Sequence, residues 1–307
     1  MKVFNTYADI PSKGRGAVLV IGNFDGVHRG HLALLEKGQA IAEKKGVPLG
    51  VLTFEPHPHR LFQPDTPPSR ITPESVKAWR LELAGTDILF SLPFNWDFAS
   101  RSAADFIQHV LIAGLDASHI VVGYDFRFGQ LRKGVPADIE AAGLPVTIVE
   151  EIADEAGAAI SSSRIRQALR HGKIEEANAL LGWDWEIRGE VIKGDRRGHE
   201  LGFPTANTAL GDTLHPAYGV YAVRACVQGE DCWYQGAANI GIRPMFEVET
   251  AQLETHIFDF DEDIYGKTLR VQPVYYLRGE AKFDSLEALI AQMESDCAQA
   301  RTLLAGV

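Results

Sequence analysis

The chain has 307 residues, of which 46% are hydrophobic and 23% charged, and its formal net charge is -11. These shares are typical of globular proteins and exclude a largely disordered or collagen-like chain. The acidic balance disfavours a broad nucleic-acid surface, and no apolar run is long enough to cross a membrane. The N-terminal residues lack the apolar stretch of a secretory signal, and the three cysteines lack a zinc-ligand spacing. We therefore expect a cytoplasmic protein with free thiols.

The first half of the chain alternates short apolar runs with segments of helical periodicity. Such alternation is typical of a doubly wound parallel sheet with helices on both faces, that is, of an α/β domain. The expected strands are 17–21, 48–54, 87–92, 119–122 and 145–150, and the expected helices are 32–45, 73–84, 103–113 and 161–170.

The stretch from Gly22 to His31 joins the first buried strand to the first helix. A strand, a glycine-bearing turn and a helix start direct backbone N–H groups and the positive end of the helix dipole at one spot, which favours an anion. His28 and His31 are three residues apart, so both project from one face and can donate to phosphate oxygens. We expect a phosphate site here. A zinc site and a capped helix with solvated histidines are the alternatives.

Further polar motifs follow later elements of the first half. Residues 56–58 and 123–129 follow the second and fourth strands, and carboxyl ends of parallel strands share one edge of the sheet. The helix at 161–170 opens with serines followed by Arg164 and Arg166, and arginines so close to a helix start favour an anionic partner. A proline-rich loop, a solvated loop and a capped helix with surface arginines are the respective alternatives.

The motifs at 22–31, 54–58, 123–129 and 161–166, in this order and spacing, resemble the adenylyltransferase module of the prokaryotic bifunctional riboflavin kinase and FAD synthetase family. The His-x-Gly-His element alone is shared with a wider nucleotidyltransferase superfamily. The resemblance implies catalytic roles for His28 and His31. It also implies contacts with ATP or its phosphates by Gly22, Asn23, Phe24, Asp25, Gly30, Ser162, Ser163, Arg164 and Arg166, and contacts with flavin by Pro56, His57, Pro58, Asp125 and Phe128.

After Gly182 the pattern changes to frequent glycines and successive strands, so we expect one domain at 1–182 and a second at 183–307. Antiparallel strands with Gly and Pro turns predict a closed β-barrel, and a long amphipathic segment predicts a C-terminal helix on its outside. The expected strands are 186–192, 219–227, 233–240, 252–259 and 268–277, and the expected helix is 285–304.

The second half contains no Gly-x-x-x-x-Gly-Lys-Ser/Thr phosphate loop, so kinase chemistry there requires a different cradle. Thr205 and Asn207 flank Ala206, and in an extended backbone their side chains face the same way and can offer oxygens to Mg²⁺. A polar barrel rim is the alternative.

Four motifs of this half, at 202–207, 219–221, 239–246 and 254–259, resemble the riboflavin kinase module of the same family. The resemblance implies that Thr205 and Asn207 hold Mg²⁺ and ATP phosphate, and that Glu254 is the base. It also implies ATP contacts by Gly198, Gly202 and Pro204 and a flavin contact by Arg243. Two residues depart from the family pattern: Met245 stands where threonine is most common, and Val135 where aspartate is common.

Together the two resemblances cover nearly the whole chain and imply the synthesis of flavin cofactors. Riboflavin is expected to be phosphorylated to FMN in the second half, and FMN to be adenylylated to FAD in the first half with release of pyrophosphate. Both reactions are expected to use ATP as co-substrate with Mg²⁺, and the kinase reaction to release ADP. An adenylyltransferase for another small phosphate and a flavin-binding protein without turnover are the alternatives.

Overall fold

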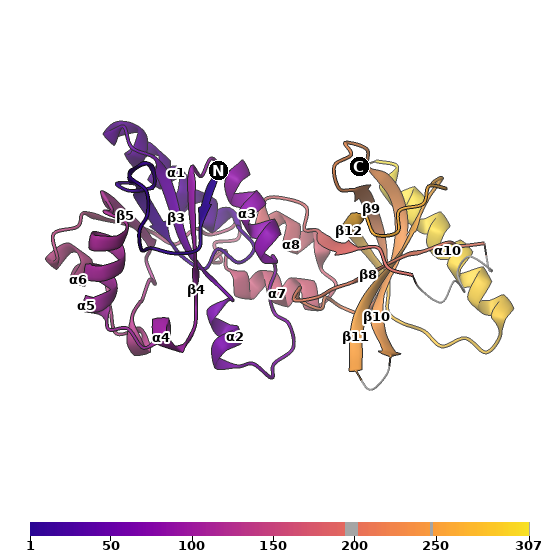
Figure 1. The fold of residues 1–307 in the computed structure, drawn as a ribbon. Coiled ribbons are helices and arrows are strands. Elements are labelled where there is room, and N and C mark those ends of the chain that lie inside the picture. The colour runs from indigo at the N-terminus through magenta and orange to yellow at the C-terminus, as the bar shows by residue number, and fades with distance from the viewer. Residues whose placement is uncertain (194–201, 246–247, 307) are drawn as a thin grey trace. The chain divides into compact units, whose positions relative to one another are not determined.

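The computed structural model describes residues 1–193, 202–245 and 248–306, which form two compact units (Figure 1). Unit 1 contains residues 1–66 and 72–161, and unit 2 contains residues 67–71 and the chain from residue 162 onward. Unit 2 therefore includes two helices that precede Gly182. The domain limits at 182 and 183 stay a prediction, because compactness alone does not define a folding unit.

Unit 1 is built on a six-stranded sheet in the order β1-β4-β3-β2-β5-β6. All neighbouring strands are parallel, which confirms the predicted α/β class. The strands are β1 (Lys2–Phe4), β2 (Val18–Ile21), β3 (Leu49–Glu55), β4 (Ile88–Pro93), β5 (His119–Gly123) and β6 (Val146–Val149).

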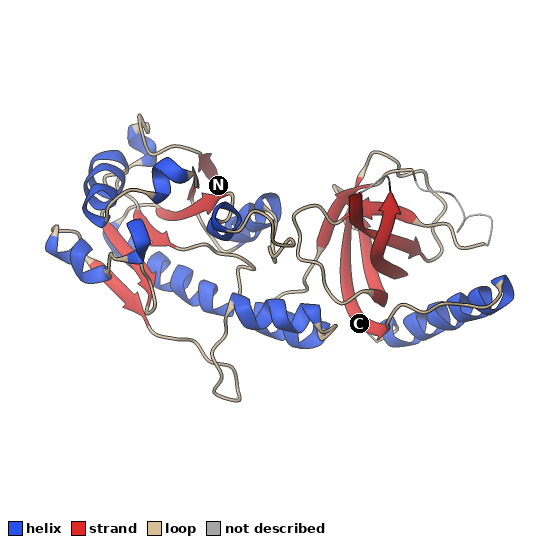
Figure 2. Cartoon of the chain, turned by 90° about the horizontal axis from the view of Figure 1, so that it is seen from below, coloured by secondary structure: helices blue, strands red, loops and turns tan. Residues whose placement is uncertain are grey.

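Helices cover both faces of this sheet (Figure 2). They are α1 (Arg29–Lys45), α2 (Pro58–Phe62), α3 (Glu74–Leu83), α4 (Trp96–Ala99), α5 (Ala103–Asp105), the π-helix η2 (Phe106–Gly114) and α6 (Pro136–Ala141), with short 3₁₀ turns η1 (Ser12–Gly14) and η3 (Gln130–Arg132). Val20 of β2 belongs to the same core as Leu35 of α1. Its neighbour Ile21 belongs to the opposite core, with Val110 of η2 and Ile139 of α6. Strands buried on both faces explain the continuous apolar runs in the sequence.

The helix expected at 103–113 is a single turn, α5, followed by the π-helix η2. The backbone N–H of Leu115 donates to the carbonyl of Val110, five residues earlier, at 2.9 Å. Four side chains of η2 are buried against the sheet: Phe106, Ile107, Val110 and Leu111. An apolar segment of this kind fits α and π geometry equally well, so its sequence could not distinguish them.

Unit 2 contains a six-stranded antiparallel sheet in the order β7-β12-β9-β10-β11-β8. Its edges meet where the N–H of Ile192 donates to the carbonyl of Asn207 at 2.9 Å, so the sheet forms a nearly closed barrel, as predicted. The strands are β7 (Ile187–Glu190), β8 (Ala206–Ala209), β9 (Gly219–Val227), β10 (Tyr234–Met245), β11 (Val248–Ile257) and β12 (Thr268–Arg278).

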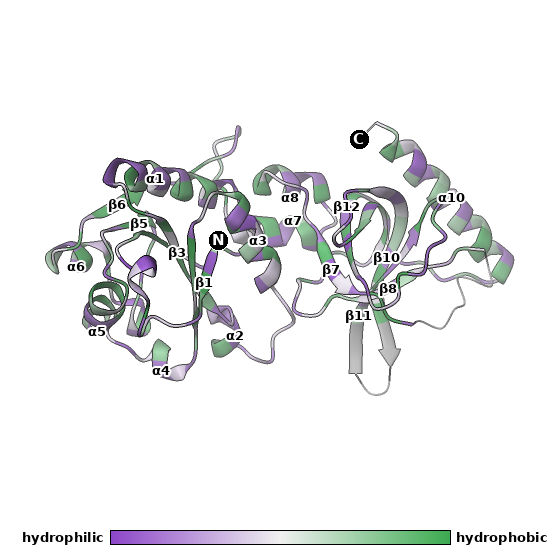
Figure 3. Cartoon of the chain, turned by 45° about the horizontal axis from the view of Figure 1, so that its top comes forward, coloured by the Kyte–Doolittle hydropathy of each residue, from purple (hydrophilic) through white to green (hydrophobic). Residues whose placement is uncertain are grey.

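Among its described residues, unit 2 also contains the helices α7 (Ser162–Arg170), α8 (Ile174–Leu181) and α10 (Leu286–Leu304). The helix α10 has hydrophilic and hydrophobic sides (Figure 3), and its Ala300 and Leu304 pack with Ala222 and Ala237 on the outer wall of the barrel. The buried Asp296 of α10 accepts from the guanidinium of Arg278 at 2.7 Å. This position of the C-terminal helix confirms the predicted architecture.

The segment 67–71 belongs to unit 2 through its backbone carbonyls. The indole N–H of the fully buried Trp185 donates to the carbonyl of Ile71 at 2.8 Å, and the N–H of Leu214 donates to that of Arg70 at 2.7 Å. Among the residues described in the two units, no helix combines the length and apolar character needed to cross a membrane.

Two glycines of the barrel allow a matched test of backbone strain. Gly219 has a φ of 144°, and a Cβ placed on it would lie 2.2 Å from the carbonyl oxygen of Arg278. Gly229 has a φ of 95° with open space around it. We expect Gly219→Ala to lower the free energy of unfolding by about 3 kcal/mol, from strain plus a clash, and Gly229→Ala by about 1 kcal/mol from strain alone. Equal losses in chemical denaturation would contradict this packing.

Candidate functional site

The carboxyl ends of β2 and β5 lie side by side where the strand order of unit 1 reverses. From β2 the chain continues to β3 and β4 on one side, and from β5 it continues to β6 on the other. Crevices at such reversals are the usual ligand sites of open parallel sheets. The stretch Gly22–His31 follows β2, and residues 123–129 follow β5. The fold thus brings two of the predicted motifs to one edge.

The loop after β2 has an unusual backbone. Phe24 and Val27 have φ values of 52° and 39°, a region that a β-branched residue such as valine rarely adopts. Their side chains are fully buried in the core that contains Leu35 of α1. Buried anchors of this kind can hold a strained backbone, and strain of this kind clusters at ligand sites.

His28 and His31 cap the start of α1 reciprocally. The N–H of His31 donates to Nδ1 of His28, and the N–H of His28 donates to Nδ1 of His31, both at 3.3 Å. The two rings are stacked, with centroids 3.6 Å apart. Because each Nδ1 accepts a hydrogen bond, this geometry assigns the ring proton of each imidazole to Nε2. Both histidines therefore offer an Nε2–H donor at the positive end of the α1 dipole.

Capping and anion binding are thus compatible, since they use different ring nitrogens. Packing against His28 explains why glycine stands at position 30, because a Cβ there would lie only 3.1 Å from the His28 ring. In the part of the chain that the structure describes, no three His, Cys, Asp or Glu side chains are grouped closely enough to hold a metal ion.

Asp25 is directed into the protein, with 3% of its surface exposed. Its Oδ1 accepts from the N–H of Thr72 at 3.0 Å, and the N–H of Gly26 donates to the Thr72 hydroxyl at 2.9 Å. Asp25 therefore fixes the shape of the loop. Its predicted contact with ATP stays a prediction, as do those of Gly22, Asn23 and Phe24.

The segment after β3 contains the short helix α2, which the sequence analysis did not predict. Nδ1 of His57 accepts from the N–H of His59 at 3.2 Å, and Pro58 occupies the first position of α2. Proline is favoured there because its missing N–H has no partner in the first turn.

An aromatic cluster that the sequence analysis did not identify adjoins this helix. Phe62 and Trp96 are 56% and 64% exposed, with ring centroids 5.6 Å apart. Phe94 lies between these rings and the half-buried Phe54, with centroids 6.0 Å from Phe62 and 5.5 Å from Phe54. Exposed aromatic faces of this kind suit a flat apolar ligand. The sequence signal that could have predicted this cluster is the run of aromatic residues at 94, 96 and 98, directly after the strand β4.

In the loop after β5, two residues predicted to bind flavin differ in their exposure to solvent. Asp125 is exposed, whereas Phe128 is 7% exposed and packs on Phe106 and Phe126 with ring centroids 5.4 and 5.5 Å away. The ring of Phe128 thus belongs to the core of unit 1. A flavin contact by either residue stays a prediction.

The start of α7 lies in unit 2. Nε of Arg166 donates to the carbonyl of Ser69 at 2.8 Å, and the guanidinium of Arg164 lies 4.0 Å from a carboxylate oxygen of Glu176. Ser163 is exposed and Ser162 is half-buried. Phosphate contacts by these four residues of α7 stay predictions.

In the barrel, the register of β11 places Glu254 opposite Asn239 of β10 and Asn207 of β8. Directly paired residues of antiparallel strands project from the same face. The three polar side chains therefore form a row on the outer wall, the face on which α10 packs. The neighbouring Leu253 and Ile240 are fully buried on the inner face.

Asn207 carries an unusual polar atom. The residue is 6% exposed, and its Nδ2 donates to the carbonyl of Thr205 at 3.2 Å. Its buried Oδ1 has no hydrogen-bond partner among the described residues. Buried polar atoms normally have partners, and an amide oxygen is a ligand that Mg²⁺ accepts. The residues present therefore fit the predicted cation.

The segment before β8 is held along β11 by His256, whose Nδ1–H donates to the carbonyl of Pro204 at 2.9 Å. Gly202 opens this segment with a φ of 87°. At the end of the same motif, hydrogen bonding to Arg301 lowers the pKa of Asp259. Gly198 and the side chains of Arg243 and Met245 lie outside the described residues.

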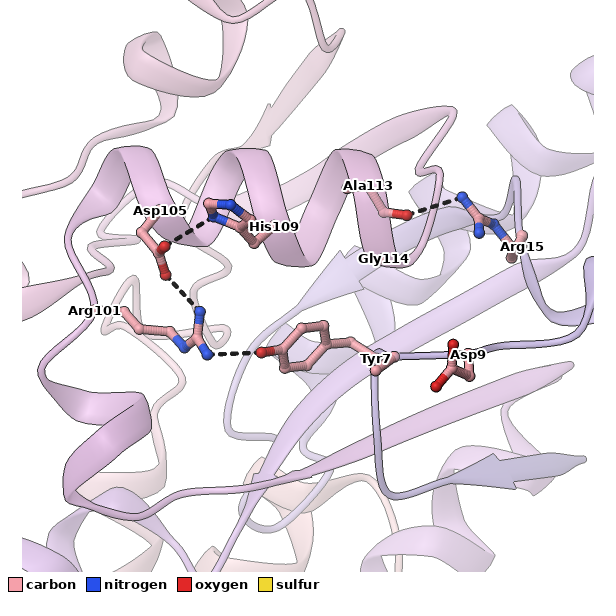
Figure 4. A pocket seen from close by; sticks show the side chains of 9 residues that line it. Tyr7, Asp9, Arg15, Arg101, Asp105, His109, Ala113 and Gly114 are labelled. Carbon is pink, nitrogen blue, oxygen red and sulfur yellow. Dashed lines mark hydrogen bonds and ion pairs between the residues drawn. The ribbon is translucent and has the colours of Figure 1, made fainter.

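A cavity of about 440 Å³ in unit 1 is lined by other residues (Figure 4). Arg101 lies between Asp105 and Tyr7 and donates to both, and Asp105 also pairs with Nδ1 of His109 at 2.8 Å. Arg15 donates to the carbonyl of Ala113. Nε of Arg101 is buried and has no hydrogen-bond partner among the described residues, and none of the lining residues belongs to the predicted motifs.

Comparisons with known proteins match both halves of the chain. The sequence model of FAD synthetase matches residues 10–164, and that of riboflavin kinase matches residues 181–304. The bifunctional riboflavin kinase/FMN adenylyltransferase of Bacillus subtilis is 41% identical over 91% of this chain and 90% of that protein. The protein of the same name from Escherichia coli K12 is 40% identical over 93% and 92%. A crystal structure named for a macrolide-efflux protein of Streptococcus pneumoniae is 36% identical over 96% of each chain, with a TM-score of 0.84.

Proposed function

The chain belongs to the bifunctional riboflavin kinase/FMN adenylyltransferase family, and we propose that its two reactions take place at the two polar sites described above. Riboflavin is phosphorylated to FMN by the riboflavin kinase half, and FMN is adenylylated to FAD by the FAD synthetase half. The main support for assigning one reaction to each half is that each half matches a different family model. The substrates are riboflavin, FMN and ATP, and the products include FAD, ADP and pyrophosphate.

In the adenylyltransferase half, a phosphate oxygen of FMN attacks the α-phosphorus of ATP, and pyrophosphate leaves. A phosphate is already anionic, so this step needs no general base and no nucleophile from the protein. The Nε2–H groups of His28 and His31 donate to phosphate oxygens on which negative charge increases in the transition state. Their position at the positive end of α1 and their fixed tautomer support this role.

In the kinase half, Glu254 accepts the proton of the riboflavin 5′-hydroxyl as its oxygen attacks the γ-phosphorus of ATP, and ADP leaves. Thr205 and Asn207 hold Mg²⁺ through their side-chain oxygens, and the buried Oδ1 of Asn207 supports this assignment. When bound, Mg²⁺ neutralises charge on the ATP phosphates. Asn239 and Asn207 flank Glu254 on the same face of the wall and orient groups near it.

The flavin ring of FMN stacks on the exposed face of Trp96, next to Pro56, His57 and Pro58, and meets Phe62 edge to face, because the two aromatic rings are inclined at 80° to each other. This proposal rests on the exposure of the two rings, since large apolar side chains in contact with water are favourable sites for a planar ligand.

We place both reactions in the cytoplasm. The chain consumes ATP, and its three cysteines are free thiols, of which Cys226 is buried and Cys232 exposed. Thiols that stay unpaired are typical of a reducing compartment.

The proposed function is tested by following flavin products. Purified protein supplied with riboflavin, ATP and Mg²⁺ is expected to form FMN first and FAD afterwards, as measured by liquid chromatography. Excess EDTA is expected to stop both products, and excess Mg²⁺ to restore them. Absence of any flavin product would overturn the function, whereas full activity in EDTA would overturn only the metal assignment.

A further inference from the structure

Lys77 of α3 is buried at the carboxyl edge of the parallel sheet, with 2% of its surface exposed. Its Nζ lies 2.6 Å from Oε1 of Glu55, 3.2 Å from the hydroxyl of Thr53 and 3.4 Å from the carbonyl of Phe54. All three atoms are acceptors suited to the N–H donors of an ammonium group. Burial of an ion pair is costly compared with apolar packing, so this arrangement calls for a role beyond filling space.

The hydroxyl of Thr53 connects the Lys77 ammonium to the loop after β2 by hydrogen bonds. Thr53 is fully buried, and its hydroxyl donates to the carbonyl of Asn23 at 3.1 Å while it accepts from Lys77. Asn23 is the second residue of the Gly22–His31 stretch. The backbone of this stretch is therefore connected to the buried ammonium through one side chain.

A second anchor comes from the start of the same helix. Thr72, which precedes the N-cap of α3, binds Asp25 and Gly26 at 3.0 and 2.9 Å. Thr53 thus holds the residue before Phe24, and Thr72 holds the residue after it, while Phe24 itself has a φ of 52°. A strained conformation persists only while its surroundings hold it, so both anchors contribute to the shape of the loop.

We propose that Lys77 is a positioning residue for ATP in the adenylyltransferase site. Its ammonium orients the Thr53 hydroxyl, the hydroxyl fixes Asn23, and the loop then presents its N–H groups and the two histidines to the phosphates. The same ammonium binds Glu55, directly before Pro56, and so links the nucleotide loop to the loop after β3. This inference rests on the proposed role of the Gly22–His31 stretch in binding ATP.

The matched pair Thr53→Val and Thr53→Ser isolates the relay, because serine keeps the hydroxyl and valine removes it at nearly the same volume. We expect Thr53→Val to raise the KM for ATP in FMN adenylylation about tenfold, and Thr53→Ser to stay within about twofold of the unaltered protein. The kcat of both is expected to change less than about threefold. The Kd of an ATP analogue with a methylene group between its α and β phosphorus atoms, measured by calorimetry, is expected to follow the KM.

Lys77 itself is tested in the double variant Lys77→Met with Glu55→Gln, because Lys77→Met alone leaves the half-buried Glu55 carboxylate without this cation. We expect the KM for ATP to rise about tenfold in the double variant as well, since the Thr53 hydroxyl is no longer oriented. Riboflavin kinase activity in the same preparation serves as the internal control and is expected to be unchanged. Lys37→Met, at an exposed position of α1, is expected to alter neither activity.

Two outcomes would overturn the proposal. One is an unchanged KM for ATP and an unchanged analogue Kd in both the Thr53→Val and the double variants. The other is a loss confined to kcat, or shared equally by the kinase reaction, which would mean a purely structural role. Failure of the underlying site is distinguishable, because it would show as continued FAD formation after removal of His28 and His31.

Discussion

A variant carrying His28→Ala and His31→Ala is expected to convert riboflavin to FMN and to form almost no FAD. In the proposed mechanism the two Nε2–H donors contact phosphate oxygens only in the adenylyltransferase reaction, and loss of one such donor typically lowers kcat 10²- to 10³-fold. We therefore expect FAD formation to fall at least about 10³-fold while the rate of FMN formation is unchanged. Chromatography of a time course with riboflavin and MgATP measures both rates, and FMN is expected to accumulate.

The reciprocal cap of α1 provides the control for this result. Alanine at the N-cap removes a hydrogen-bond acceptor and lowers stability by about 1 kcal/mol, whereas asparagine keeps one. His28→Asn is thus expected to retain the Tm of the unaltered protein and still to lose FAD formation, because its side chain does not extend to the position of Nε2. If FAD formation persisted in His28→Asn, the cap and not the donor would be the function of His28.

The architecture of both units could be predicted because their strands carry strong local patterns. The strand expected at 17–21 is β2, whose alternate residues enter two different cores. In contrast, β1 has only three residues and lies at the sheet edge, so it offers neither length nor periodicity. The helix start at α2 was missed for a related reason, since prolines indicate a break and also occupy first helical turns.

Within the sites, local spacing identified groups that lie near one another in the sequence and missed those brought in by tertiary contacts. The spacing of His28 and His31 predicted a shared face, yet their reciprocal caps depend on ring orientation. Thr72, just before α3, contacts the Gly22–His31 stretch directly, and Lys77 of α3 is connected to it through Thr53. Both lie far along the chain, and nothing in their own sequence context indicates these contacts. The resemblance implied a flavin contact for Phe128, which stays a prediction, whereas the packing of its ring against Phe106 could not be predicted from the sequence.

The complementary variant, Glu254→Gln, is expected to lose the other reaction. Glutamine keeps the size and hydrogen bonding of glutamate and cannot accept the proton of the riboflavin hydroxyl, so the kinase rate is expected to fall at least about 10²-fold. Added FMN is expected to be converted to FAD at the rate of the unaltered protein. The matched control is Glu262→Gln, an exposed position between β11 and β12, which is expected to leave both reactions unchanged.

Mixing the two inactive forms then tests whether the sites work independently. The variant without His28 and His31 makes FMN from riboflavin, and Glu254→Gln makes FAD from FMN, so the mixture is expected to convert riboflavin to FAD although neither protein does so alone. Released FMN must pass through solution in this experiment, so the lag before FAD appears should shorten as the concentration of the Glu254→Gln protein rises. A mixture that made FMN and no FAD, while Glu254→Gln still converted added FMN, would mean that the first site does not release its product. A Glu254→Gln protein that failed on added FMN would instead show that this carboxylate serves both reactions.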